Sequence, residues 1–288
     1  MRIGAHMSVS GGKHLVFESA KELGCEAIQI FVRNVRGWTS GPLKQIEIDD
    51  FLKKKEELKD KIWPIISHNS YLINLASLDK EKLEKSYNAM FDELSKVNQL
   101  NIEYENMHPG VIPISDKKEI TKLEALTQIA DQLNKLIEAT KSSKAIILLE
   151  TTAGQGKGLG NKFHHFKTII NKIQNKNRIG ICLDTAHSFA AGYDFTTKKG
   201  YKEMWNEFDD IIGLKYLFAF HLNDTDKECG SRVDRHTHIG QGKIGKEPFS
   251  FFINDERFRD MPGILETPKG KDMKEDLMNL KTLKSLRK

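Results

Sequence analysis

Cysteine is scarce in this chain, and its three copies lie far apart. Cys25, Cys182 and Cys229 form no Cys-x-x-Cys pair, which excludes a zinc finger built on cysteine. Such sparse cysteine usage is typical of proteins in a reducing compartment. We therefore expect an intracellular protein.

Long apolar runs and linker segments are also missing. The apolar runs are only about five residues long, whereas a membrane-spanning helix needs about 20 apolar residues. The N-terminus leads directly into a strand-like segment and has no apolar core of a signal peptide. No stretch rich in proline, glycine or serine divides the 288 residues. We expect one soluble, monomeric domain over residues 1–288, without membrane association.

The charge of the chain is only weakly one-sided. Its 45 lysines and arginines outnumber its 40 acidic residues, for a formal net charge of +5. This excess permits a polyanionic partner, and it equally suits ordinary solubility. The total charge alone therefore does not choose a partner.

Strand-like and helical segments alternate along the whole chain. Two amphipathic helical patterns are clear, from Lys80 to Val97 and from Lys122 to Ala139. Alternating strands and helices predict a parallel sheet, and eight repeats favour a closed (β/α)8 TIM barrel. The fourth strand is the least typical, because Glu103, Glu105 and Asn106 are unusual in such a core. The predicted strands are 2–7, 27–31, 63–68, 102–108, 145–150, 179–184, 217–224 and 263–267.

Residues that commonly bind metals stand at or near the ends of these strands. The carboxyl ends of all barrel strands meet at one rim, where active sites of this fold form. Histidine and carboxylate ligands without thiolate suit zinc, manganese or iron. Since the set exceeds the four ligands of one tetrahedral ion, it implies several metal ions. The strand-end residues are His6, His68, His108, Glu150, Asp184, His221 and Glu266.

Two short motifs add further ligand candidates. In "LDTAH", His187 follows the strand-end aspartate by three residues across a strand-to-helix turn, so both can face the rim. In "VDRHTH", Asp234 and His236 lie on one side of an extended chain, and Arg235 faces the other way, where it can meet a phosphate. His238 continues the same alternation. The periodicity alone therefore does not choose between the two histidines.

The ligand set also indicates a chemistry. Two metal ions about 3.5–4 Å apart that share a carboxylate are the usual arrangement for hydrolysis of a phosphodiester. Glu150 closes a central strand of the predicted barrel. It is therefore the natural bridging ligand.

Nine segments in series resemble the endonuclease IV family of apurinic/apyrimidinic endonucleases, and together they cover nearly the whole chain. They are "IGAHMSVSGG", "FVRNVRGW", "HNSYLINLAS", "MHPG", "LETTAGQG", "CLDTAH", "HLNDT", "VDRHTHIGQG" and "ETP". The resemblance implies a (β/α)8 barrel with three zinc ions per chain, replaceable by Mn²⁺ or Fe²⁺. It implies hydrolysis 5′ to an abasic site in double-stranded DNA by a zinc-activated hydroxide, which leaves a 3′-hydroxyl and a 5′-deoxyribose phosphate. It also implies a 3′-repair phosphodiesterase activity.

The resemblance further assigns nine residues to the three ions, with one carboxylate shared. The first zinc would be held by His68, His108 and Glu150. The second would be held by Glu150, Asp184, His221 and Glu266. The third would be held by His187, Asp234 and His236. This assignment selects His236 over His238, and it leaves His6 and His238 as neighbours that support the ligands.

The DNA contacts implied by the resemblance lie in other loops. The matching positions are Arg36, Tyr71 and Leu72, which the family inserts into the duplex at the lesion, with Asn34 and Arg235 as further contacts. An aromatic and an aliphatic side chain can fill the vacated base stack, and a guanidinium can occupy the abasic gap. Without the resemblance, core packing after a strand would be the simpler interpretation of Tyr71 and Leu72.

Two rival functions fit parts of the same pattern. A metal-dependent sugar isomerase or epimerase of the same barrel superfamily would use one or two divalent ions and no lesion-inserting loop. The combination of His187 with Asp234 and His236 is the feature that discriminates against it. A catalytically inactive DNA-binding protein is the second rival. It would not need all nine proposed ligands, and none of them is missing here.

Overall fold

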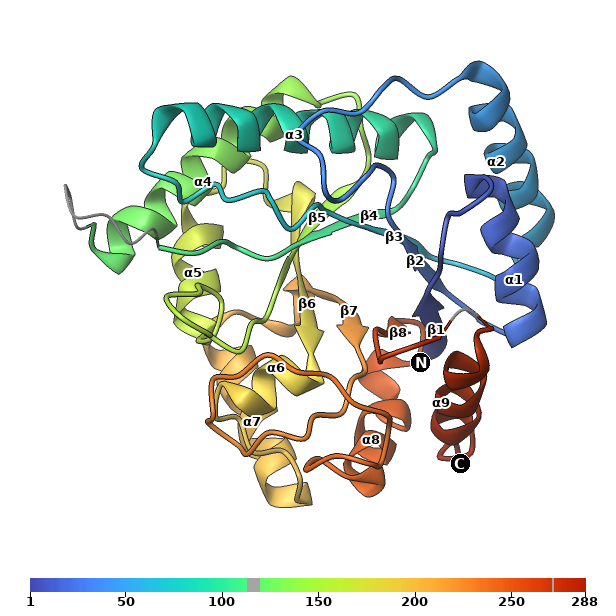
Figure 1. Ribbon diagram of the computed structural model, residues 1–288. Coiled ribbons are helices and arrows are strands. Elements are labelled where there is room, and N and C mark those ends of the chain that lie inside the picture. Colours follow the sequence, from blue (N-terminus) through green and yellow to red (C-terminus); the bar gives the residue numbers. More distant parts are fainter. Residues whose placement is uncertain (113–119, 271) are drawn as a thin grey trace.

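Eight parallel strands close into a barrel in chain order (Figure 1). The computed structural model describes residues 1–112, 120–270 and 272–288. The first strand pairs with the last along four residues, so the sheet has no free edge. The predicted TIM barrel is thus confirmed. The strands are β1 (Arg2–His6), β2 (Ile28–Ile30), β3 (Ile65–His68), β4 (Tyr104–Met107), β5 (Ile146–Glu150), β6 (Ile179–Asp184), β7 (Leu217–His221) and β8 (Pro262–Leu265).

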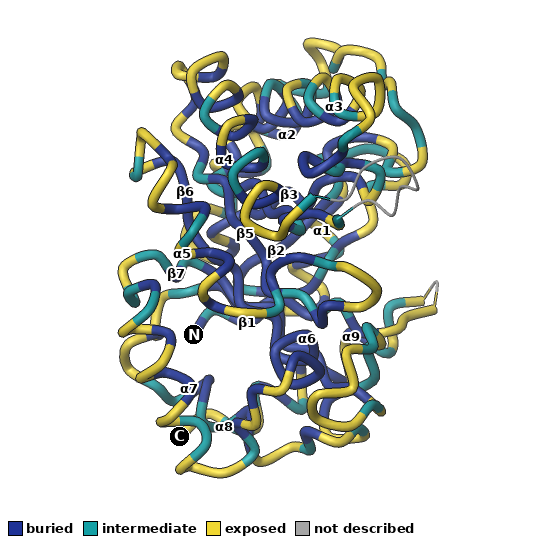
Figure 2. The backbone as a smooth tube through the Cα atoms, turned by 90° about the vertical axis from the view of Figure 1, so that its left-hand side faces the viewer, coloured by how far each residue is buried: buried dark blue, intermediate teal, exposed yellow. Residues whose placement is uncertain are grey.

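Helices follow the strands and cover the outside of the barrel (Figure 1). Figure 2 shows the strands buried at the centre, with exposed residues on loops and outer helical turns. Within the described parts of the chain, no helix combines the length and apolar character needed to cross a bilayer. The helices are α1 (Val16–Leu23), α2 (Gln45–Leu58), α3 (Lys80–Gln99), α4 (Lys122–Ala139), α5 (Phe163–Lys172), α6 (Thr185–Ala190), α7 (Lys198–Ile211), α8 (Lys246–Ile253) and α9 (Lys274–Lys284).

The two helices predicted from periodicity begin where their sequences provide caps. Asp79 accepts a hydrogen bond from the first turn of α3. Thr121 forms a capping box with Glu124 at the start of α4, in which each side chain accepts from the other residue's backbone N–H. These caps satisfy N–H groups that have no partner within the helix. Most apolar residues of both helices are buried in the shared core against the barrel, whereas Phe91 of α3 and Leu123 of α4 are exposed.

All eight predicted strands are present, and all but the sixth are shorter than predicted. The seventh ends at His221 instead of residue 224. The reason is that Asn223 and Asp224 find partners outside the sheet. The Asn223 N–H donates to Thr185 Oγ1 over 2.9 Å, and the Asp224 carbonyl accepts from the Thr237 N–H over 2.8 Å. The chain therefore leaves the sheet and enters the rim loop.

The interior of the barrel is built in layers. Successive side chains of a strand point to opposite faces, so residues two apart share the inside. One interior layer is apolar and fully buried, and it consists of Ala27, Ile66, Leu148, Cys182, Ala219 and Ile264. Two residues further along the same strands, toward their carboxyl ends, a second layer is polar. This polar layer consists of Gln29, His68, Glu150, Asp184, His221 and Glu266, with His6 and Asn106 at the matching positions of β1 and β4.

The polar fourth strand is explained by partners on both sides of the barrel wall. Glu103 accepts a hydrogen bond from the Ile65 N–H over 2.9 Å, and its other oxygen lies 2.7 Å from Lys55 Nζ. Asn106 points inward with the polar layer. Glu105 points outward and is completely buried. Burial raises the pKa of Glu105 well above its usual range, and the neighbouring Glu93 of α3 raises it further.

A neutral Glu105 predicts a specific pH dependence of stability. The folded chain keeps the Glu105 proton at a pH where the unfolded chain releases it, so this residue makes folding less favourable as pH rises between the two pKa values. Glu105→Gln removes the ionisation and keeps the shape. Relative to wild type, we expect the variant's free energy of unfolding to increase by up to about 1.4 kcal/mol per pH unit between about pH 5 and pH 7.

Urea unfolding of both proteins across this pH range measures the difference. The other titrating groups are common to the two chains, so most of their contribution cancels. A difference that stays constant with pH would show that Glu105 is already ionised in the folded protein.

Candidate metal centre

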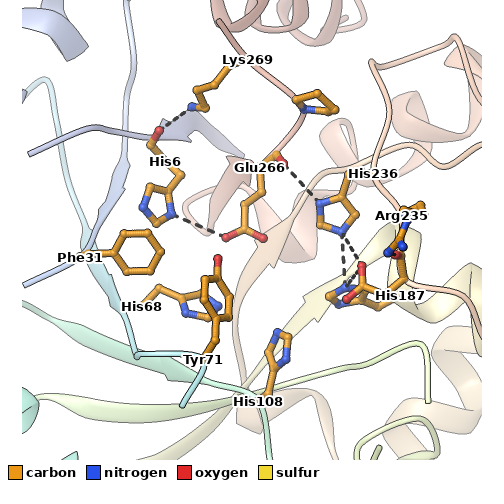
Figure 3. Close-up of a pocket in the computed structure, with 12 residues that line it drawn as sticks. His6, Phe31, His68, Tyr71, His108, His187, Arg235, His236, Glu266 and Lys269 are labelled. Atoms are coloured by element: carbon orange, nitrogen blue, oxygen red, sulfur yellow. Dashed lines mark hydrogen bonds and ion pairs between the residues drawn. The ribbon is translucent and has the colours of Figure 1, made fainter. Parts of the chain in front are cut away.

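The polar layer opens at the rim into a cavity of about 430 Å³. Figure 3 shows histidine rings from several strands and loops converging on this space, with Glu266 near its middle. Among the described residues, three groups of histidines and carboxylates offer ligand atoms within 4.8 Å of one another. We refer to them as the first group (His68, His108, Glu150), the second group (Glu150, Asp184, His221, Glu266) and the third group (Asp184, His187, His236).

The first group gathers around one oxygen of Glu150. His68 Nε2 lies 3.2 Å and His108 Nε2 lies 3.3 Å from Glu150 Oε2. The His68 Nδ1–H donates to the Asn69 carbonyl over 2.9 Å, which leaves the Nε2 lone pair directed at the site. The Asn106 side-chain amide donates to the same Glu150 oxygen over 2.6 Å. The polar fourth strand, β4, therefore orients the Glu150 carboxylate.

The second group gathers around the other oxygen of Glu150. His221 Nδ1 lies 3.0 Å from Glu150 Oε1 and 3.1 Å from Glu266 Oε2. Asp184 Oδ2 lies 3.8 Å from the same His221 nitrogen. Because its two oxygens face different groups, Glu150 has the geometry of a bridging ligand.

The third group lies toward the outer rim. His236 Nε2 is 3.4 Å from His187 Nε2 and 3.6 Å from Asp184 Oδ2. Asp234, the residue proposed here from the resemblance, reaches the same corner, with its Oδ1 3.2 Å from His187 Nε2 and 3.8 Å from His236 Nε2. The His187 Nδ1–H donates to the Thr151 carbonyl over 2.8 Å, which leaves Nε2 as the ring nitrogen that faces the site.

Buried negative charge makes this site suited to cations. Burial opposes the ionisation of Glu150, but His221 and His108 hold its pKa well below the usual range. Burial likewise opposes the ionisation of Glu266, but His221 holds the pKa of this carboxyl well below the usual range. Burial also opposes the ionisation of Asp234, but His187 lowers the pKa of this carboxyl to about 2. Ionised carboxylates beside imidazole nitrogens, without a thiolate, form a donor set that fits divalent zinc, manganese or iron.

The remaining two histidines of the rim lie outside these groups. His6 accepts a hydrogen bond from the Gln29 amide over 2.9 Å and lies 3.7 Å from Glu266. His238 turns away from the cavity, and its Nδ1 lies 3.1 Å from the Asn279 amide of α9. The structure thus brings His236, and not His238, against His187.

One buried aspartate anchors the loop that carries Asp234 and His236. The Asp224 carboxylate accepts backbone N–H bonds over 2.9 Å from Gly240 and 3.0 Å from Gly242. It also accepts from the N–H groups of Thr225 and Ile244. A side chain at position 242 would place its Cβ 2.4 Å from Asp224 Oδ1, so only glycine allows this close approach.

The proposed DNA-contacting residues occupy two neighbouring loops and the rim. Tyr71 is 69% exposed, which is inconsistent with core packing, while Leu72 is half-buried. Asn34 and Arg36 are exposed on the loop after β2. Tyr71 and Arg235 line the cavity (Figure 3), whereas Asn34, Arg36 and Leu72 do not.

A hydrogen bond joins these two loops. The Ser70 hydroxyl donates to the Val35 carbonyl over 2.8 Å. Ser70 precedes Tyr71 on one loop, and Val35 lies between Asn34 and Arg36 on the other. The two sets of proposed contacts are therefore held side by side.

Several polar residues of the site were not predicted from the sequence. Gln29, Asn223 and Asp224 are completely buried and bond to ligands or to the loop that carries them. Gln29 could have been found, because it stands two residues after an interior alanine on its strand. Asn223 and Asp224 offer no such signal, since their partners are distant in the sequence.

Comparisons with known proteins show relatives that match almost the whole chain. Residues 17–283 match the family described as Xylose isomerase-like TIM barrel. The "Probable endonuclease 4" of Chloroflexus aurantiacus is 46% identical over 285 residues, which cover 99% of this chain and 98% of that protein. The "Apurinic-apyrimidinic endonuclease" of Caenorhabditis elegans is 42% identical over 93% of this chain and 66% of its own length.

Solved structures of other proteins also resemble this chain. The crystal structure of endonuclease IV from Thermus thermophilus superposes with a TM-score of 0.85 at 32% identity, and it covers 99% of this chain and 98% of that one. A D-tagatose 3-epimerase-like protein also superposes, with a TM-score of 0.73, but at 19% identity. This second likeness shows a shared fold alone.

The Asp224 anchor predicts a selective loss of metal. Asp224→Ala leaves several buried N–H groups without an acceptor, at a cost of about 1–3 kcal/mol for each unsatisfied group. The loop that carries Asp234 and His236 should then lose its fixed position. We expect the zinc content, measured by elemental analysis after equilibration with zinc, to fall by about one ion per chain.

The exposed Asp226, two residues away, provides a matched control. Asp226→Ala should keep the full zinc content. Full zinc content in Asp224→Ala, with unchanged circular dichroism, would show that the loop does not depend on this anchor.

Proposed function

The chain belongs to the endonuclease IV family, and we propose that it is a DNA-repair nuclease that hydrolyses the phosphodiester 5′ to an abasic site in double-stranded DNA. The products would be a 3′-hydroxyl and a 5′-deoxyribose phosphate, and the same site would trim blocked 3′ ends. The observation that carries this proposal is the geometry of Glu150. Its two oxygens face two separate groups of ligands, with a third group beside them.

Three zinc ions are the proposed cofactors, with Mn²⁺ or Fe²⁺ as substitutes. His68, His108 and Glu150 would hold one ion, and Glu150, Asp184, His221 and Glu266 a second. His187, Asp234 and His236 would hold the third. When bound, such ions neutralise the charge of a phosphodiester and lower the pKa of water toward neutrality. The carboxylates supply four negative charges against six positive ones, so the loaded site would keep the positive balance that a phosphodiester requires.

The protein's own side chains would position the substrate. Arg235 is exposed at the rim, and its guanidinium donates to the Asp234 carbonyl over 2.6 Å, which places a positive charge beside the third group. Tyr71 lies above the cavity, with its ring centre 5.9 Å from that of His68 and 6.0 Å from that of Phe31. An exposed aromatic ring beside a metal site can replace a missing base in the stack. A nucleotide without its base is also the cheapest one to extrude from a duplex, which favours the lesion over intact DNA.

A duplex that carries one tetrahydrofuran abasic analogue tests the activity. The analogue cannot undergo β-elimination, so strand cleavage by the zinc-loaded protein reports hydrolysis. Partners that merely support metal ligands account for about 10- to 100-fold of affinity or activity. We therefore expect Glu150→Ala, which removes the shared ligand itself, to reduce incision by more than about 100-fold.

Glu84→Ala, at an exposed position of α3, is the control and should incise like wild type. Absence of incision by zinc-loaded wild type would refute the proposal. A metal content near one ion per chain would instead favour the isomerase or epimerase alternative, which uses fewer ions.

Tyr71 should matter for recognition of the lesion and not for the metal centre. Stacking of an aromatic ring on a base is worth about 1–3 kcal/mol. We expect Tyr71→Ala to weaken binding of the abasic duplex by a factor consistent with that energy, with unchanged zinc content. Fluorescence anisotropy with abasic and intact duplexes measures this change.

Phe91→Ala provides the control, because Phe91 is an exposed aromatic residue on the outer helix α3. It should bind both duplexes like wild type. Equal discrimination between the duplexes by wild type and Tyr71→Ala would contradict the role of Tyr71.

A further inference from the structure

Gln29 occupies a ligand position without being a ligand. It belongs to the polar layer of the barrel, between His6 of β1 and His68 of β3, and it is completely buried. Its neighbour in the apolar layer, two residues earlier in the chain, is Ala27. A buried amide can satisfy its hydrogen bonds only through specific neighbours. The partners of Gln29 therefore indicate why a glutamine stands among metal ligands.

Both ends of the Gln29 amide contact ligands of the second group. Gln29 Oε1 lies 2.8 Å from His221 Nε2. Gln29 Nε2 donates to Glu266 Oε1 over 2.5 Å and lies 2.9 Å from His6 Nδ1. One side chain thus links a histidine on β7, a carboxylate after β8 and a histidine on β1.

Chemistry fixes the direction of each of these bonds. If the amide were reversed, its oxygen would face the Glu266 carboxylate, and two acceptors would oppose each other at hydrogen-bond distance. The amide oxygen must therefore face His221. Because an amide oxygen only accepts, His221 carries a proton on Nε2, which leaves Nδ1 as the nitrogen that can bind a metal ion.

The free atoms are those that face the rest of the second group. His221 Nδ1 lies 3.0 Å from Glu150 Oε1 and 3.1 Å from Glu266 Oε2. Glu266 Oε1 is occupied by the amide of Gln29. A single amide therefore leaves one ligand atom available on each of two residues.

We propose that Gln29 is a positioning residue that selects His221 Nδ1 and Glu266 Oε2 as the ligand atoms of the second group. The inference rests on the metal-binding part of the proposed function, and it does not depend on the DNA substrate. His6 contributes to the same arrangement, because its Nδ1 accepts a hydrogen bond from the Gln29 amide. Asn106 has a corresponding place in the first group, where it donates to Glu150.

Metal affinity tests the proposal without any DNA. Gln29→Met keeps the volume of the side chain and removes all three of its hydrogen bonds. Loss of such a supporting partner typically weakens metal binding by about 10- to 100-fold. In zinc competition with a chelator, we expect the affinity for one zinc ion per chain to fall by about that factor, while the affinity for the other ions stays unchanged. Gln132→Met, which removes a buried amide from the outer helix α4, should change nothing.

The tautomer of His221 provides a second measurement that a loss of stability would not imitate. In ¹H–¹⁵N correlation spectra of histidine-labelled, zinc-loaded protein, wild type should show His221 with its proton on Nε2, assigned by its loss in His221→Gln. Gln29→Glu retains the acceptor and should keep that proton. In Gln29→Met, the His221 Nε2 proton should lose its protection from exchange with solvent.

Two results would overturn the inference. One is unchanged affinity for all ions in folded Gln29→Met. The other is zinc-loaded wild type in which His221 binds through Nε2. A wild-type protein that binds zinc through His221 Nδ1 but does not incise DNA would leave the role of Gln29 intact and refute only the proposed substrate.

Discussion

The alternation of side chains along eight parallel strands is the constraint on which the site depends. The pleat sends every second residue inside, and closure of the barrel brings these residues to common levels. An apolar level lies beneath the polar one, from Ala27 to Ile264. The apolar level closes the site from below, and the rim cavity lies on the other side of the ligands. The barrel wall thus holds the ligands of the metal centre more rigidly than loops would.

The polar layer is stable only because its charges and hydrogen bonds compensate one another. Ionised carboxylates at this depth would be very unfavourable in isolation. Here they face imidazoles, which in the absence of metal can carry the compensating protons, and a divalent ion can take the same role. Amide side chains have a different task, since they carry no charge. Gln29, Asn106 and Asn223 determine which oxygen or nitrogen of a ligand remains available.

Much of this architecture could be predicted from the sequence, because it depends on local periodicity. The eight strands, the two clear helices and the convergence of strand-end ligands all follow from spacing along the chain. The distinction between His236 and His238 does not, since both have the same parity. It depends on Asp224 and Asn279, which fix the loop through contacts with residues far away in the sequence. The end of β7 also differs from the prediction, because Asn223 and Asp224 form hydrogen bonds outside the sheet.

The proposed substrate contacts are built on a different principle from the metal centre. Apart from Arg235, they lie on two loops that are tied to α3. Buried Arg33 donates to the Gly37 carbonyl over 2.8 Å and lies 3.7 Å from Glu93, whose carboxylate accepts from the Ser70 N–H over 3.0 Å. Arg33 and Glu93 thus hold the bases of both loops, while Tyr71 and Arg36 remain exposed at the surface. Rigid strands fix atoms that must bind metal, and anchored loops leave the residues that must enter a duplex free to adjust to it.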